Sequence, residues 1–170
     1  MATAKDILAQ IKEKDVKYVD VRFTDIRGKM QHVTFDIDLV DDDFLTDGTM
    51  FDGSSIAGWK AINESDMKLR PDLDSAIVDP FYQQTTLALF CDVVNPDTGT
   101  PYNRDPRSIA KAALNYTKQL GIGDTVYFGP EAEFFIFDDV RWSIDPFDTF
   151  YSLDSIELPR NSSKEYPEGN

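Results

Sequence analysis

The stretch MFDGSSIAGW, at residues 50–59, contains side chains whose types and spacing could do chemistry. Asp52 offers a carboxylate, which can bind a cation or accept a proton, and two serine hydroxyls follow it. The same residue types are common in surface turns, because Asp-Gly and Ser-Ser pairs suit tight backbone turns. The residues therefore allow either a plain turn or a loop that places an acid and a hydroxyl at a reaction centre.

Apolar residues at both ends of this stretch argue against a plain surface turn. Large apolar side chains are costly to leave in water, so we expect them to hold the loop against something, another subunit being one candidate. A loop held in this way can aim its polar side chains. The apolar residues are Met50, Phe51, Ile56 and Trp59.

A second stretch, YFGPEAEFFIF at residues 127–137, places two carboxylates one residue apart. We predict a strand over residues 125–137, and its alternation would put Glu131 and Glu133 on one face with aromatic neighbours. Two carboxylates about 7 Å apart repel by roughly 2 kcal/mol at an effective dielectric constant near 20. Such a pair suits a wet polar face, a face with basic partners opposite, or a site for the hard cations Mg²⁺ or Mn²⁺. The residues alone leave all three open.

The elements that must position these stretches follow from periodicity and turn signals. The pattern predicts a capped helix, a β-hairpin, two further strands and a second capped helix, which together make a small α+β unit with its sheet packed on a helix. The expected positions are a helix capped near Thr3, strands over 16–24 and 29–35 joined by a turn at 25–28, strands over 66–73 and 85–94, and a helix between Asp105 and Gly121. A turn-rich segment at residues 95–101 is the best domain boundary.

Composition narrows the classes of partner. The formal net charge is −14, from 31 acidic and 17 basic residues, and such a field disfavours nucleic acid and anionic membrane surfaces. No apolar run is long enough to span a bilayer, and the first residues lack a signal-peptide pattern. Cys91, the only cysteine, lies in an apolar run, which predicts a buried, inert thiol and suits a reducing cytoplasm. His32, the only histidine, is interpreted as structural or exposed.

Five motifs together resemble the N-terminal part of type I (bacterial-type) glutamine synthetases. They are DVRFTDIRGKMQHVTF, DGTMFDGSSIAGW, ESDMKLRPD, DPRSIAKAAL and FGPEAEFFIFD. The resemblance runs from the first expected helix to the C-terminus. It implies a β-grasp domain over residues 1–104, followed over residues 105–170 by the incomplete beginning of a catalytic domain, since family members are more than twice this length.

The resemblance also implies a reaction and its parts. Family members use ATP to phosphorylate L-glutamate, and ammonia then displaces phosphate from the γ-glutamyl phosphate, with two or more divalent ions (Mg²⁺ or Mn²⁺) at the site. Asp52 resembles the carboxylate that binds ammonium and takes its proton, and Ser55 resembles its supporting hydroxyl. Glu131 resembles a ligand of the metal on the ATP phosphates, and Glu133 a ligand of the metal on the glutamate side. The subunits form a homo-oligomeric ring, expected to be a dodecamer, in which the Asp52 loop reaches a neighbouring subunit's site.

Two other functions stay open at this point. One is a γ-glutamyl ligase that acts on another amine, although an intact Asp52 and Ser55 favour ammonia. The other is a non-catalytic β-grasp assembly module. The resemblance places the remaining metal ligands and most of the nucleotide and glutamate pockets beyond Asn170, so the 170-residue chain alone is expected to be inactive.

Overall fold

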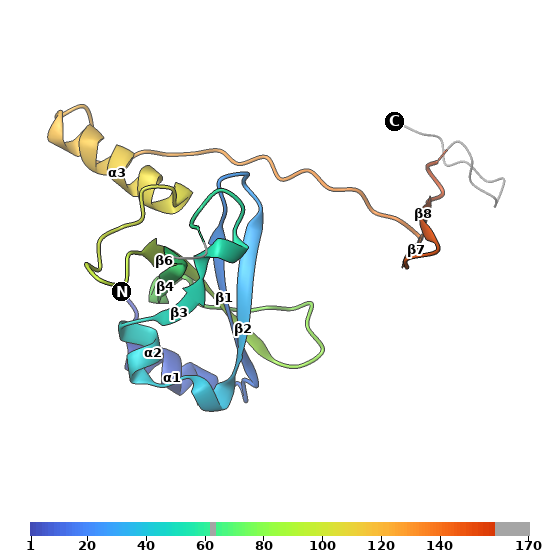
Figure 1. Cartoon of the computed structure of the whole chain (residues 1–170), viewed down its shortest axis with the longest axis horizontal. Coiled ribbons are helices and arrows are strands. Elements are labelled where there is room, and N and C mark those ends of the chain that lie inside the picture. Colours follow the sequence, from blue (N-terminus) through green and yellow to red (C-terminus); the bar gives the residue numbers. More distant parts are fainter. Residues whose placement is uncertain (62–63, 159–170) are drawn as a thin grey trace. The chain divides into compact units, whose positions relative to one another are not determined.

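The computed structural model describes residues 1–61 and 64–158, and its internal contacts define two units, Met1–Val126 and Tyr127–Asn170. Helices α1 to α3 and strands β1 to β6 belong to the first unit, and strands β7 and β8 to the second (Figure 1). The helices and strands are α1 (Ala4–Glu13), β1 (Tyr18–Thr24), β2 (Met30–Asp36), α2 (Asp42–Thr46), β3 (Thr49–Asp52), β4 (Asp66–Pro71), β5 (Ile77–Val78), β6 (Thr86–Val94), α3 (Pro106–Gln119), β7 (Asp139–Ile144) and β8 (Thr149–Asp154). Short 3₁₀ helices are η1 (Ile37–Leu39), η2 (Gly53–Ser55) and η4 (Leu73–Ser75).

Helix α1 begins with the cap predicted from the sequence. The Thr3 hydroxyl accepts a hydrogen bond from the Asp6 N–H at 3.3 Å, and the Asp6 carboxylate accepts one from the Thr3 N–H at 2.8 Å. This reciprocal pair satisfies two backbone donors that have no partner inside the helix. The apolar face of the helix then turns Ile7 and Ile11 into the core.

The first unit is built on one mixed sheet, with strand order β2-β1-β6-β4-β3 and β5 paired with β6. Strands β1 and β6 are parallel, and the other pairs of this sheet are antiparallel. The β1–β2 hairpin and the strands β4 and β6 confirm the hairpin and the two later strands predicted from the sequence. The α+β class is therefore confirmed.

The core lies between one face of this sheet and the helices α1 and α2. The apolar residues Val19, Val21 and Phe23 of β1 are buried, as their period of two predicts, and each contributes about 1.5–3 kcal/mol through burial; Asp20 between them is buried as well. The core residues from the sheet include Val19, Val21, Phe23, Met67, Leu69, Leu87, Leu89 and Val93, and those from α2 are Phe44 and Leu45. Cys91 lies among them, which confirms its predicted burial, and this burial raises the pKa of its thiol to about 12, which favours the unreactive protonated form.

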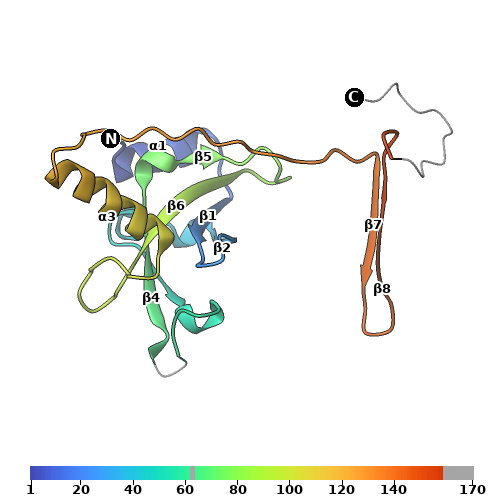
Figure 2. The same ribbon diagram turned by 90° about the horizontal axis from the view of Figure 1, so that it is seen from above.

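Helix α3 lies beside β6 (Figure 2) and is capped by Asp105, as predicted. The buried Asp105 carboxylate accepts hydrogen bonds from the N–H of Arg107 at 3.2 Å and from the N–H and hydroxyl of Ser108 at 3.1 and 2.6 Å. It also accepts a hydrogen bond from the N–H of Val93 in β6, at 3.3 Å. One side chain therefore caps α3 and joins it to the sheet.

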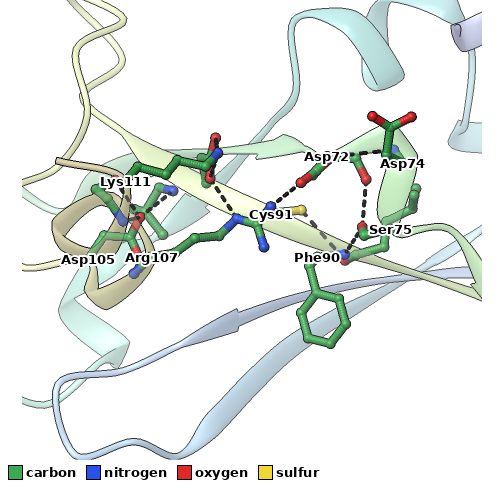
Figure 3. A network of polar contacts seen from close by, with 12 residues as sticks. Asp72, Asp74, Ser75, Phe90, Cys91, Asp105, Arg107 and Lys111 are labelled. Atoms are coloured by element: carbon green, nitrogen blue, oxygen red, sulfur yellow. Dashed lines mark hydrogen bonds and ion pairs between the residues drawn. The ribbon is translucent and has the colours of Figure 1, made fainter. Parts of the chain in front are cut away.

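Ion pairs add to this attachment (Figure 3). The Arg107 guanidinium pairs with Asp72 and with Asp92, the latter at 2.8 Å, and the Lys111 ammonium lies 2.6 Å from Asp92. Burial alone would raise the pKa of Asp92, but the hydrogen bonds and charges of Lys111 and Arg107 outweigh it and hold the pKa below its usual range. These pairs attach α3 to Asp92 in β6 and to Asp72, which follows β4.

Removal of the Asp105 carboxylate is expected to destabilise the first unit. Asp105→Ala removes a helix cap and leaves the buried Val93 N–H without its acceptor, which together cost about 2–3 kcal/mol in the free energy of unfolding. Urea denaturation followed by circular dichroism measures this loss. Asp41→Ala, which removes the exposed cap of α2, is the matched control and should cost about 1 kcal/mol. Equal losses in the two variants would contradict the role of Asp105 in joining helix and sheet.

The strand predicted over residues 125–137 is not present, so this prediction was wrong. These residues form neither helix nor strand. A strand needs hydrogen bonds to a neighbouring strand, and none of the strands in the described part of the chain pairs with this segment. The second unit instead has the antiparallel hairpin β7–β8, whose exposed apolar side chains include Val140, Trp142, Ile144, Phe150 and Tyr151.

Within the described ranges, no helix has the length and apolar character needed to cross a bilayer.

Candidate functional site

Asp52 is the last residue of β3 and lies opposite Asp66 of β4 in the strand register. Its Oδ1 accepts two hydrogen bonds from Ser54, from the N–H at 2.8 Å and from the hydroxyl at 2.6 Å. The residue itself is exposed. The end of β3 therefore presents an accessible carboxylate whose orientation is set by its own loop.

The charged form of Asp52 is favoured by these neighbours. The hydroxyl and the N–H of Ser54 hold the pKa of Asp52 below its usual range, and the Ser65 hydroxyl acts in the same direction; slight burial opposes them. Asp52 is thus an anion at neutral pH. It is well suited to bind a cation, but it is a weak base in this environment.

The hydroxyl nearest to Asp52 differs from the one expected by resemblance. Ser54 contacts the Asp52 carboxylate, whereas Ser55 is exposed and forms no side-chain hydrogen bond with any described residue. A role for Ser55 stays a prediction. The contact of Ser54 could have been found from spacing alone, because an aspartate often binds the N–H two residues later in a turn.

The apolar ends of the loop pack inside the same chain. The buried Trp59 ring lies 5.5 Å from Phe23, 6.2 Å from Phe51 and 5.4 Å from Tyr102, measured between ring centroids. Ile56 is also buried. The core of the first unit therefore supplies the contact for which another subunit was one candidate, while Met50 stays exposed.

Hydrogen bonds to backbone groups anchor the loop at both ends. The Gly53 N–H donates to the Ser65 carbonyl at 2.7 Å, and the Tyr102 hydroxyl donates to the Trp59 carbonyl at 2.8 Å. Arg104 donates to the carbonyls of Gly58 and Trp59. A Cβ at Gly53 would lie 2.5 Å from the Met67 side chain, so only glycine fits there without movement. Asp52 is therefore carried by a loop that is anchored at both ends.

Glu131 and Glu133 lie in the second unit, and both are exposed. Neither forms an ion pair with a described residue, so the alternative of a face with basic partners opposite finds no support among the described residues. Their carboxylates are the donors that Mg²⁺ and Mn²⁺ prefer, but such ions take about six ligands. Among the described residues, no group of three or more His, Cys, Asp or Glu side chains could hold a metal ion. The metal site stays a prediction that needs further ligands.

His32 has a structural contact. Its Nδ1 lies 2.7 Å from Oδ1 of the buried Asp20, which also accepts hydrogen bonds from Thr34 and Arg22. Burial alone would raise the pKa of Asp20, but hydrogen bonds from Arg22, Thr34 and His32 lower it below its usual range. The interpretation of His32 as structural is supported by this network.

Comparison with known proteins agrees with this architecture. The glutamine synthetase β-grasp domain matches residues 15–96, and the glutamine synthetase catalytic domain matches residues 103–168. The fold and these matches define the class: a glutamine synthetase β-grasp domain followed by the start of a glutamine synthetase catalytic domain. The chain belongs to the glutamine synthetase family. The proposed boundary between residues 104 and 105 stays a prediction, because the internal contacts instead divide the chain after Val126.

Similar proteins are found among bacteria. The chain is 65% identical to a glutamine synthetase of Azorhizobium caulinodans and 63% identical to one of Bradyrhizobium diazoefficiens, in each case over all of its 170 residues. These residues make up 36% of each relative, so the chain spans about a third of their length. The cryo-EM structure of Plasmodium falciparum glutamine synthetase matches with a TM-score of 0.69 over 98% of this chain and 33% of that one. At 23% identity, this likeness shows the fold alone.

Proposed function

We propose that this chain is part of a glutamate–ammonia ligase, which uses ATP to join ammonia to L-glutamate through γ-glutamyl phosphate. The observation that carries the proposal is the 65% identity to a glutamine synthetase over the whole chain, which includes both acidic stretches. As a ligase of this class it would act in the cytoplasm, without nucleic acid or membrane as a partner. The net charge of −14 disfavours nucleic acid and anionic membrane surfaces as partners.

Asp52 is proposed to bind ammonium and then take its proton. An exposed anion at the end of β3 can pair with ammonium, and the hydrogen bonds from Ser54 favour its charged form. A carboxylate with a lowered pKa does not readily deprotonate free ammonium. Because ammonium has no lone pair, it must first give one proton to Asp52, which produces a small population of bound ammonia. This ammonia adds to the acyl carbon, the bond to phosphate breaks, and the departing phosphate takes the second proton from nitrogen, which draws the first, unfavourable transfer forward. We therefore assign Asp52 to binding first and to proton transfer second.

Glu131 and Glu133 are proposed to bind the divalent ions, Mg²⁺ or Mn²⁺, on the ATP and glutamate sides respectively. When bound, such ions neutralise phosphate charge and align the reacting groups for phosphoryl transfer. The two glutamates lie in the second unit and Asp52 lies in the first, so a reaction that uses all three draws on both units. A homo-oligomeric ring, a dodecamer by family resemblance, is the proposed arrangement that brings the Asp52 loop to a neighbouring subunit.

A chimera provides a direct test of the proposal. The 170 residues replace the matching 170 residues of the A. caulinodans relative, and glutamine formation is measured from ATP, glutamate and ammonium. The chimera is expected to be active, and the 170-residue chain alone inactive. A correctly assembled chimera that makes no glutamine would contradict the proposal. Turnover with another amine but not with ammonium would favour a different γ-glutamyl ligase, and assembly without any turnover would favour a structural module.

Neutral replacements test the two glutamates. Glu131→Gln and Glu133→Gln in the chimera keep side-chain size and remove the charge that a hard cation prefers. Each is expected to lower kcat by at least about 100-fold, and to raise the Mg²⁺ concentration needed for half-maximal activity. Glu157→Gln, an exposed glutamate of the same unit, is the control and should leave both quantities unchanged. An unchanged Mg²⁺ requirement in both test variants would remove these residues from the metal site.

A further inference from the structure

The Asp52 carboxylate is held mainly by one residue that the family resemblance did not single out. Both the N–H and the hydroxyl of Ser54 donate to the same oxygen, Oδ1. The hydroxyl contact, at 2.6 Å, has the short length typical of a hydrogen bond to an ionised carboxylate. Two bonds from one residue to one oxygen leave the carboxylate little freedom to rotate.

Ser54 is itself fixed in place. It is the middle residue of η2, and the N–H of the preceding Gly53 is bound to the Ser65 carbonyl at 2.7 Å. The buried Trp59 closes the loop five residues later. The loop anchored to the first unit therefore places the Ser54 hydroxyl. The hydrogen bonds from Ser54 in turn orient the Asp52 carboxylate.

The contacts also leave Asp52 with capacity for a ligand. An ionised carboxylate offers about four lone-pair directions; Ser54 occupies two of them on Oδ1, and the Ser65 hydroxyl also stabilises the charged group. The remaining directions lie on an exposed side chain. A small cationic N–H donor such as ammonium can bind there without displacing Ser54.

We propose that Ser54 is a positioning residue for ammonium binding, which acts by holding the Asp52 carboxylate in the orientation that receives the cation. The inference rests on the proposed function, since Asp52 must be the ammonium site for Ser54 to act through it. The side-chain contact of Ser54 is with the Asp52 carboxylate, so its effect on ammonium would act through that carboxylate. Its loss should therefore weaken ammonium binding and leave the other two substrates unaffected.

Substrate-specific kinetics in the chimera test this role. Ser54→Ala removes the hydroxyl bond and is expected to raise KM for ammonium about tenfold, the effect of one hydrogen bond to a charged group, with KM for ATP and glutamate unchanged. Ser54→Thr keeps a hydroxyl and should restore most of the affinity. Ser143→Ala is the matched control, because it removes a similar serine hydroxyl bond, to Asp145 at 2.9 Å, in the second unit. It should change none of the three KM values.

The outcomes separate this inference from the proposed function. If Asp52→Ala keeps full ammonium-dependent turnover, the assignment of Asp52 fails and the role of Ser54 fails with it. If Asp52→Ala is inactive but Ser54→Ala has the parent KM for ammonium, only the positioning role is overturned. A rise in all three KM values, or no rescue by Ser54→Thr, shows a merely structural effect and also overturns it.

A second measurement covers the case in which the Ser54→Ala chimera fails to assemble. The carboxyl ¹³C chemical shift of Asp52, followed against pH in the 170-residue chain, reports its pKa directly. Because the Ser54 hydroxyl stabilises the charged form, its removal should raise the pKa of Asp52 toward the usual value. Ser55→Ala should leave it unchanged. An equal pKa in the parent chain and Ser54→Ala would overturn the inference.

Discussion

Asp52→Ala is expected to lower kcat/KM for ammonium in the chimera by about 10²- to 10⁴-fold, the range typical of a lost acid–base group. The substitution removes both the anion that pairs with ammonium and the acceptor for its proton. The binding of ATP should be preserved, because no described side-chain contact of Asp52 reaches beyond its own loop and Ser65. Steady-state kinetics with ammonium as the varied substrate, together with an ATP-binding titration, measure the two effects.

Asp52→Asn separates charge from shape. The amide can keep a hydrogen bond from Ser54 through its carbonyl oxygen, but it has no negative charge and cannot take a proton. If charge is the essential property, Asp52→Asn should be nearly as inactive as Asp52→Ala. Ammonium-dependent turnover within about threefold of the parent in either variant would defeat the assignment of Asp52.

Trp59→Ala is expected to lower the free energy of unfolding of the first unit by about 3–5 kcal/mol. The Trp59 ring packs against Phe23, Phe51 and Tyr102, so its truncation leaves a large cavity in the core. The loss should also loosen the loop that carries Asp52, since the Tyr102 ring that packs on Trp59 also donates its hydroxyl to the Trp59 carbonyl. Urea denaturation of the 170-residue chain, followed by far-ultraviolet circular dichroism, measures the change.

Two further variants make this prediction specific. Trp142→Ala is the control: that side chain is 66% exposed in β7, so its loss should change stability by less than about 0.5 kcal/mol. Trp59→Phe should cost far less than Trp59→Ala. The buried Nε1 of Trp59 has no hydrogen-bond partner among the described residues, and phenylalanine removes that unsatisfied donor while keeping an aromatic ring. Equal losses for Trp59→Ala and Trp142→Ala would show that Trp59 does not anchor the loop.

Local chemistry in the sequence was sufficient to predict several elements. The caps at Thr3 and Asp105 mark the starts of α1 and α3 because their side chains bind N–H groups within three residues. The alternation of Val19, Val21 and Phe23 predicts the buried face of β1, since neighbouring side chains on a strand point to opposite faces. The two acidic stretches also identified the family, because together they form a specific combination of motifs.

Only the tertiary structure decided which distant segments meet. The parallel pairing of β1 with β6, the closure of Trp59 onto Tyr102 and the contact of Asp105 with Val93 join residues that no local pattern connects. The same reason explains the error at residues 125–137: alternation describes a possible strand, but a strand forms only where a partner supplies hydrogen bonds.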